Sequence, residues 1–313
     1  MPATLPLVTA YVALPQQEGF AISQTIQEER PDTAMHAILQ DLTPERIRAS
    51  IDANEIAYGG FLSTYPQAHL HNDLGICWFE TDIPLNFLNQ VLQTRLEPAA
   101  LPATIDRIIT HFQSRGLPFL WNIGPSSQPA DLGDFLQARG IVHDEDEPGM
   151  AVDLLTLHED LPRASNLVTS EVVTHEQLYQ WTRVWGCGAP DWVTDLCFTA
   201  YSGLRFGPQT PLHFYLGTLD GEPVTTTTLF FGAGVASIRH VVTVHKARRQ
   251  GIGAAMTLRA AHEARRQGYR VAVLHASPMG IHIYRRLGFR EYCTFSTYEW
   301  YPTSDQQAQA GPA

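Results

Sequence analysis

Alternating apolar and polar positions in the second half of the chain predict a group of β-strands. Three runs, 212–219, 224–231 and 235–244, are rich in β-branched and aromatic residues, and short turns at 220–221 and 232–234 separate them. Strands joined by turns this short pair antiparallel, because a parallel connection needs a dozen or more residues. The pattern therefore predicts an antiparallel meander.

The hydrophobic period changes after this meander from two residues to between three and four. Ile252, Ala255 and Met256 recur at helical spacing, which predicts a helix over 251–267. The apolar run 271–276 follows and must lie parallel to the strand at 235–244, because the helix carries the chain back across the sheet. We therefore expect an α/β fold, with a mixed, mostly antiparallel central sheet and helices on both of its faces.

The first half of the chain repeats the order of these elements without repeating their sequence. A helix, an apolar strand, a second helix and a further strand follow one another in both halves. They are expected at 103–116, 117–123, 130–140 and 150–154 in the first half, and at 257–268, 270–276, 281–288 and 292–300 in the second.

A polar stretch at 158–165, which contains Pro162, lies between the two repeats. It predicts two tandem domains, 1–160 and 161–302. The segment 303–313 is expected to be a disordered tail, because it holds almost no large apolar residues. A length of 313 residues agrees with two domains.

The composition is that of a globular protein, with 44% hydrophobic and 17% charged residues. No run approaches 18 consecutive apolar residues, and the chain does not open with a basic segment, an apolar run and a cleavage site. We therefore expect a cytoplasmic protein that has no contact with a membrane and is a monomer or a homodimer.

The spacing of cysteine and histidine argues against a disulfide and against a metal. No C-x-x-C pair is present, so buried free thiols are favoured. His69, His71 and Asp73 are close in sequence but lack a fourth ligand, and we expect no metal cofactor. The cysteines are Cys77, Cys187, Cys197 and Cys293.

Positive charge is concentrated in one part of a chain whose net charge is −11. Residues 236–290 hold 11 Lys or Arg and a single acid, Glu263. Such a block attracts an anionic ligand, although a solvated helix face accounts for part of it. The acidic balance of the whole chain and the lack of aromatic residues among these arginines argue against nucleic acid.

Arg248, Gly251 and Gly253 form an R-x-x-G-x-G turn where the strand pattern gives way to the helix. Unpaired N–H groups at a helix N-terminus bind anions, and glycine lets the backbone approach phosphate oxygens closely. Taken alone, the motif also fits an ordinary strand-to-helix turn. Met256 stands where a dinucleotide fingerprint has its third glycine, and no G-K-[ST] is present, which excludes those two phosphate-binding classes.

This turn resembles the pyrophosphate loop of the GCN5-related N-acetyltransferases, the GNAT family, with its R/Q-x-x-G-x-G/A pattern. The segment SPMGIHIYRRLGF at 277–289 resembles the family's N-x-x-A-x-x-x-Y-x-x-x-G-F, with Ser277 in the Asn position and Tyr284 in the Tyr position. The resemblance is strong from about 165 to 300 and weak before that. It implies an acetyltransferase that moves an acetyl group from acetyl-CoA to an amine of a small molecule or peptide.

The resemblance also implies roles for residues. Tyr284 takes the position of the general acid, and backbone N–H groups at 249–254 take that of the diphosphate cradle. The residues expected to bind acetyl-CoA are Val241, Val242, Thr243, Arg248, Arg249, Gln250, Gly251, Ile252, Gly253, Ala254, Ser277 and Tyr284. The family's V-x-P-E-x-R start reads T-V-H-K-A-R at 243–248, which loses Pro and Glu but keeps the spacing to Arg248.

The general base is less defined. The strand before the loop contains no acid, and His240 is its only residue whose pKa suits the task. Strand alternation predicts that His240 faces away from Arg239, Val241 and Thr243. Three alternatives to His240 as the base stay open. The histidine is structural, a water chain removes the proton, or the reaction has no dedicated base.

The first repeat lacks both cofactor motifs. The segment 95–107 before its helix contains no glycine, and aligning Gly140 with Gly288 places Leu136 where Tyr284 stands. We expect a degenerate GNAT-like copy that binds no CoA and walls the acceptor cleft. The alternative for the whole chain is a non-enzymatic sensor or partner module that binds an acyl-CoA.

The acceptor and the length of the acyl group are not defined by the sequence. The segment WGCGAPDWVTDLCF holds two tryptophans and two aspartates that either bind a cation or form a helix cap and core aromatics. These residues are Trp185, Asp191, Trp192 and Asp195.

Overall fold

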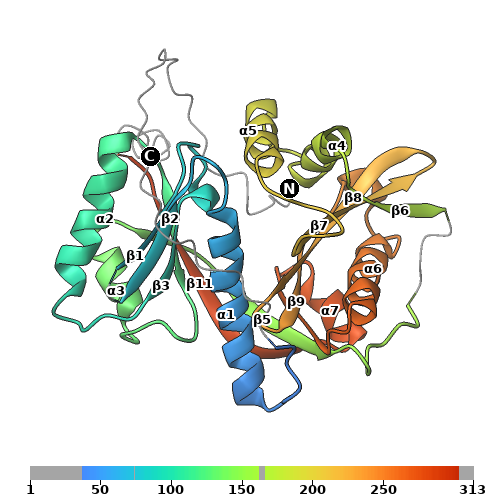
Figure 1. Cartoon of the computed structure of the whole chain (residues 1–313), viewed down its shortest axis with the longest axis horizontal. Coiled ribbons are helices and arrows are strands. Elements are labelled where there is room, and N and C mark those ends of the chain that lie inside the picture. The colour runs from blue at the N-terminus through green and yellow to red at the C-terminus, as the bar shows by residue number, and fades with distance from the viewer. Residues whose placement is uncertain (1–36, 74, 162–165, 303–313) are drawn as a thin grey trace, which may run out of the picture.

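The computed structural model describes residues 37–73, 75–161 and 166–302 (Figure 1). The tail expected at 303–313 lies outside these residues, as does part of the polar stretch at 158–165. We call 37–161 the N-terminal half and 166–302 the C-terminal half.

Within the described residues, eleven strands form one mixed sheet in the order β1-β2-β3-β4-β11-β5-β10-β9-β8-β7-β6. The strands are β1 (His69–Asp73), β2 (Ile76–Glu80), β3 (Gln90–Thr94), β4 (Phe119–Ile123), β5 (Val142–Asp153), β6 (Leu167–Glu171), β7 (Leu212–Leu219), β8 (Glu222–Gly232), β9 (Val235–Thr243), β10 (Val271–His275) and β11 (Arg290–Trp300). The α-helices are α1 (Pro44–Leu62), α2 (Leu101–Arg115), α3 (Leu132–Gln137), α4 (His175–Trp185), α5 (Asp191–Ser202), α6 (Ile252–Arg266) and α7 (Ile281–Leu287).

The predicted meander is confirmed. Strands β7, β8 and β9 pair antiparallel in sequence order. Helix α6 then leads to β10, which pairs parallel with β9 as expected. The corresponding β3 and β4 of the N-terminal half are also parallel and are joined through α2. The two halves therefore share the order strand, helix, parallel strand, helix, strand.

Two strands are exchanged between the halves. Strand β5, from the N-terminal half, lies between β11 and β10, and β11, from the C-terminal half, lies between β4 and β5. Each half thus supplies its last strand to the sheet of the other, and β5 and β11 pair antiparallel along most of their length. The domain boundary at 160 stays a prediction, but the sheet is continuous across it.

Helices cover both faces of the sheet, as predicted. Alternation along β7 shows this: Phe214 and Leu216 pack with α4 and α5, whereas Tyr215 packs with α6. Helix α6 lies close to the sheet because its buried face includes Ala260, Ala261 and Ala264.

Helix α1 lies between the two halves (Figure 1) and packs into both of their cores. Ile51 packs with Val273 and Phe295 of the C-terminal half. Phe61 lies in one cluster with Phe79 of the N-terminal half and packs against Phe230 of the C-terminal half. Burying a side chain of this size contributes about 2 kcal/mol to stability. The helix is therefore part of both cores. None of the described helices combines the length and apolar character that a membrane span requires.

Candidate active site

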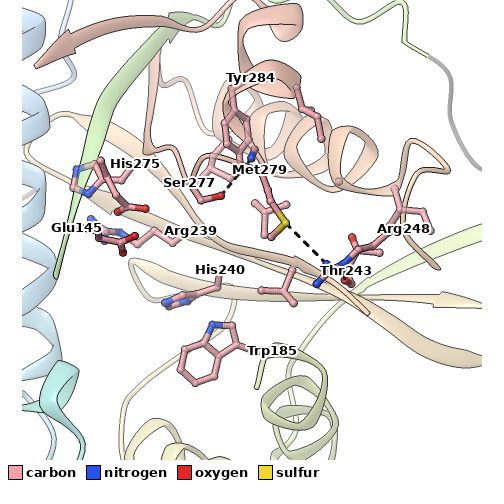
Figure 2. Close-up of a pocket in the computed structure, with 18 of the residues that line it drawn as sticks. Glu145, Trp185, Arg239, His240, Thr243, Arg248, His275, Ser277, Met279 and Tyr284 are labelled. Carbon is pink, nitrogen blue, oxygen red and sulfur yellow. Dashed lines mark hydrogen bonds between the residues drawn. The ribbon is translucent and has the colours of Figure 1, made fainter. Parts of the chain in front are cut away.

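A cavity opens where two parallel strands of the sheet separate. Strands β9 and β10 pair only at Ala236–Ala272 and Ser237–Val273, and beyond these pairs they diverge. The space between them is a cavity of about 860 Å³. In Figure 2, Arg248 and Thr243 lie at one side of it, and Glu145, Arg239 and His275 lie together at the other.

The glycine turn forms the first side of the cavity. Gly251 precedes α6 with φ +77°, and Arg249 has φ +62°, so the chain makes a left-handed turn that favours glycine. No described side chain caps the helix. The first N–H groups of a helix have no partner within the helix, so those of α6 are left uncapped. Arg248 holds the turn against β9, because its Nε donates to the Thr243 carbonyl oxygen at 3.0 Å.

This turn fits a diphosphate. Around Gly253, a Cβ atom would meet only Ile283 Cδ1, at 3.8 Å, so the space beside this backbone is open toward the cavity. Arg248, Arg249 and Arg286 add positive charge to the same wall. Unpaired N–H groups, room for close approach and positive charge are the features that an anion needs at a helix N-terminus.

The structure brings nearly all of the predicted binding residues to one cavity. The lining includes Val241, Val242, Thr243, Arg248, Arg249, Gly251, Ile252, Gly253, Ala254, Ser277 and Tyr284, and among the predicted binding residues Gln250 is not part of it. Gln250 is an exposed residue of the turn. The individual roles of these residues stay predictions.

Tyr284 points into the cavity from α7 (Figure 2). Only 9% of the residue is exposed, and its ring packs against Phe289 with centroids 5.9 Å apart. Burial, together with the negative charge of Glu147, raises the pKa of Tyr284 to about 12. The phenol therefore keeps its proton at neutral pH. Beside it, Ser277 Oγ accepts a hydrogen bond from the Gly280 N–H at 3.3 Å, at the start of α7.

The predicted alternation along β9 is wrong at His240. Thr228 pairs with Arg239 but Thr226 pairs with Val242, so β9 contains one extra residue, and His240 has φ +53°. This β-bulge interrupts the two-residue period of the strand. As a result, all five residues from 239 to 243 line the cavity.

His240 lies among aromatic rings and is neutral. Its ring centroid is 5.2 Å from that of Trp185 and 5.6 Å from that of Trp181, and its Nδ1 lies 3.0 Å from Thr228 Oγ1. Burial and then the charge of Arg239 lower the pKa of His240 to about 3. A histidine with so low a pKa is a weak proton acceptor. The catalytic role of His240 stays a prediction, and this environment favours the structural alternative.

Acidic residues from the exchanged strands form the second side of the cavity. Glu145 and Glu147 of β5 and Glu299 of β11 line it. Asn86, in the 3₁₀ turn Asn86–Leu88, donates from Nδ2 to Glu299 at 2.7 Å. These carboxylates do not stand out in the sequence, because each repeat reads as a sheet of its own. The run Asp-Glu-Asp-Glu at 144–147, directly before an apolar strand, was the available signal.

A half-buried ion pair connects this side of the cavity to the N-terminal half. Arg239 Nη2 lies 2.5 Å from Glu55 Oε2 of α1, and the guanidinium stacks over the ring of Tyr58 at 4.1 Å. His275 lies 3.8 Å from the same Glu55 oxygen. The bulged strand is thus held in place by a helix of the other half.

Other residues from the sequence analysis lie away from the cavity. His71 pairs with Glu80, and Asp73 with Arg107. No group of His, Cys, Asp or Glu among the described residues has metal-binding geometry. All four cysteines are described and free, with Cys197 buried and the other three half-buried.

The aromatic and acidic residues of the segment 185–198 lie in different environments. Trp185 lines the cavity. Asp191 stands in the first turn of α5 and pairs with Arg183 at 2.5 Å, while Trp192 is 39% exposed. Neither aspartate of the segment lines the cavity, so its carboxylates do not join the acidic side.

Comparison with known proteins agrees with this geometry. Residues 210–291 match the family model of the acetyltransferase (GNAT) domain. A search of curated protein sequences gives no match.

Solved structures resemble most of the chain. A GCN5-related N-acetyltransferase from Kribbella flavida is 21% identical with a TM-score of 0.61, over 79% of this chain and 95% of that one. A tandem GNAT protein from the clavulanic acid biosynthesis pathway is 16% identical with a TM-score of 0.53, over 88% and 98%. At these identities the likeness shows the fold alone. Residues 210–291 therefore form a GNAT acetyltransferase domain, and the chain that carries it has a GNAT-like fold.

Proposed function

We propose that this protein transfers an acetyl group from acetyl-CoA to an amine of a small molecule or peptide, with Tyr284 as the general acid. The observation that carries the proposal is that one cavity contains the glycine turn before α6, the hydroxyl-bearing ring of Tyr284 and a wall of carboxylates. An anion site and a cation site therefore face the same space.

In this proposal the first side of the cavity holds the co-substrate. Acetyl-CoA supplies the thioester when bound. The N–H groups at the start of α6, with Arg248 and Arg249, hold the diphosphate, and the backbone at 241–243 holds the pantetheine arm. Tyr284 donates a hydrogen bond toward the sulfur as the thiolate leaves, which its retained proton allows.

The second side of the cavity suits an amine. Carboxylates from β5 and β11 favour a ligand that arrives as an ammonium ion. These groups come from the strand exchange, so the N-terminal half contributes directly to the acceptor site.

We propose that the N-terminal half itself binds no CoA. Its segment 95–100 before α2 contains no glycine. Leu136, which occupies the position of Tyr284, is fully buried in the core around α2 and β4. The half is thus a degenerate copy that keeps the topology of the catalytic one.

An acetyl-transfer assay tests the proposal. The full-length protein with acetyl-CoA is offered a panel of primary amines, and release of the free thiol is followed with a chromogenic reagent. We expect turnover of at least one amine. Binding of CoA by calorimetry without any turnover would favour the sensor alternative, and absence of CoA binding would overturn both.

A further inference from the structure

Strand β5 extends past the end of β10 into the mouth of the cavity. The last ladder pair of the two strands joins His275 to Gly149, and the Ala276 N–H then donates to the Pro148 carbonyl oxygen at 3.1 Å. The next residue along β5 toward its N-terminus is Glu147, opposite Phe295 of β11. Glu147 therefore stands where β10 stops and the space between β9 and β10 opens.

Three of the four consecutive acids of β5, Asp144, Glu145 and Glu147, line the cavity. Asp146 instead accepts hydrogen bonds outside it, from Ser296 at 2.6 Å and from the His143 ring at 2.9 Å. Asp146 is exposed, while Glu145 and Glu147 are half-buried.

Glu147 has no committed partner. No hydrogen bond or ion pair joins its carboxylate to any other described residue, in contrast to Glu299, which Asn86 holds, and to Glu55, which Arg239 holds. Burial, and then the negative charges of Glu145 and Glu55, raise the pKa of Glu147 to about 7. A carboxylate with this pKa can accept and release a proton near neutral pH.

Glu147 and Tyr284 line the same cavity. The charge of Glu147 contributes to the raised pKa of Tyr284, so the two groups interact. The charged and titratable groups that act on them are Glu55 of α1, Asp144 and Glu145 of β5 and Arg239 of β9.

We propose that Glu147 is the general base of the transfer, and that the N-terminal half thereby supplies a catalytic residue to the site through its exchanged strand. The inference rests on the proposed acetyl transfer and adds to it the group that deprotonates the acceptor. Glu145, two residues further from the end of β10, stays part of the acidic wall.

The proton balance uses both groups. The acceptor ammonium gives one proton to Glu147, and its nitrogen then attacks the thioester carbonyl carbon. As the C–N bond forms and the C–S bond breaks, the nitrogen loses a second proton. Tyr284 gives its proton to the departing thiolate and is restored by this second proton, while the first proton leaves to solvent from Glu147.

Single-turnover kinetics test this assignment with the amine that the wild-type protein acetylates fastest in the panel. Glu147→Gln should lower the rate at pH 7 about 10²-fold or more, and Glu147→Asp should restore part of it. Asp146→Asn is the matched control, since it removes the same charge one residue away and outside the cavity. It should keep the wild-type rate.

The pH profile separates a base from a structural role. The wild-type rate should rise to a plateau through about pH 7, the value expected for Glu147. In Glu147→Gln this limb of the profile, the rise to a plateau near pH 7, should disappear. The rate should then follow the fraction of unprotonated amine and rise about tenfold for each pH unit. Methoxyamine, which is already neutral at pH 7, should be acetylated by this variant with a smaller loss.

Thermal unfolding gives a readout that needs no substrate. A folded-state pKa of about 7, above the ordinary 4.5, makes wild-type stability fall as the pH rises from about 4.5 through 7. Glu147→Gln lacks this loss, so its Tm relative to wild type should increase over that interval and then level off. A Tm difference independent of pH would overturn the assignment.

Failure of the inference and of the proposed function can be told apart. A wild-type protein that acetylates amines, with a Glu147→Gln variant that loses no more activity than Asp146→Asn or keeps the limb near pH 7, disproves the base alone. A wild-type protein that binds acetyl-CoA and acetylates no amine disproves both.

Discussion

The unit β3–α2–β4 of the N-terminal half and the unit β9–α6–β10 of the C-terminal half have the same topology and different chemistry. Each places a helix between two parallel strands. Before α6 the chain passes through left-handed residues at Arg249 and Gly251, whereas 95–100 before α2 contains no glycine. The shared topology therefore does not determine the backbone conformation at the start of the helix, and of the two turns it is the one before α6 that has the features that fit an anion.

The helices that follow these units, α3 and α7, also differ in chemistry. Tyr284 of α7 carries a hydroxyl at the cavity wall, whereas Leu136 of α3 is fully buried in an apolar core. The N-terminal unit is thus well packed without a hydroxyl-bearing ring at this position, because a core position accepts Leu readily. The N-terminal unit keeps its fold and serves the other half by lending it β5.

Separating the two halves should have the largest effect on folding. Expression of 161–313 without 1–160 should give no cooperatively folding protein, because β11 loses both of its neighbours, β4 and β5. Circular dichroism during heating measures this. Co-expression of 1–160 and 161–313 as separate chains should restore a soluble complex. A cooperative transition of 161–313 alone, near the full-length Tm, would contradict the role given to the exchange.

The two helix N-termini can be compared by placing the same charge at each. Gly253→Glu should weaken CoA binding by about 10³-fold or more, because a carboxylate would occupy the open side of the turn. Calorimetry measures the affinity. Ala103→Glu, at an exposed position in the first turn of α2, is the control and should leave Kd unchanged. Equal affinities for Gly253→Glu and wild type would remove the turn from the cofactor site.

Tyr284→Phe tests the difference between α7 and α3 with a smaller change. The ring and its packing stay, so Tm and the Kd for CoA should change little, while the single-turnover rate of acetyl transfer should fall about 10²-fold. Tyr269→Phe, at a ring that stacks on Phe231 away from the cavity, is the control and should keep the wild-type rate. A Tyr284→Phe variant of normal rate would show that the hydroxyl has no part in protonating the thiolate.

One CoA should bind to each chain, because only the C-terminal unit has the glycine turn. Titration calorimetry of the full-length protein with CoA measures this number. Saturation at two CoA per chain would show that the N-terminal unit binds the cofactor without glycine.

The sequence predicted those features that depend on local patterns. The meander, the crossover through α6 and the turn at 248–253 follow from periodicity and from glycine placement within short windows. The position of His240 was missed, because a β-bulge shifts the period by one residue without a mark in the local pattern.

The exchange of β5 and β11 could not be predicted from such windows. Both strands read as ordinary last strands of their own repeat, and their partners lie far away in sequence. For the same reason the carboxylates of the cavity were missed: Glu147 comes into the site only through a pairing between distant segments.

The placement of Glu147 makes the site sensitive to chain length as well as to side-chain identity. A strand shows alternate residues to alternate faces, so one residue inserted between Glu147 and Gly149 would turn Glu147 outward and Asp146 inward. A single-codon insertion or deletion here would therefore disturb the acidic side of the cavity more than many substitutions. Selection on the chemistry of one half should then act on the length of a strand encoded in the other, and this would hold the two segments together as one gene.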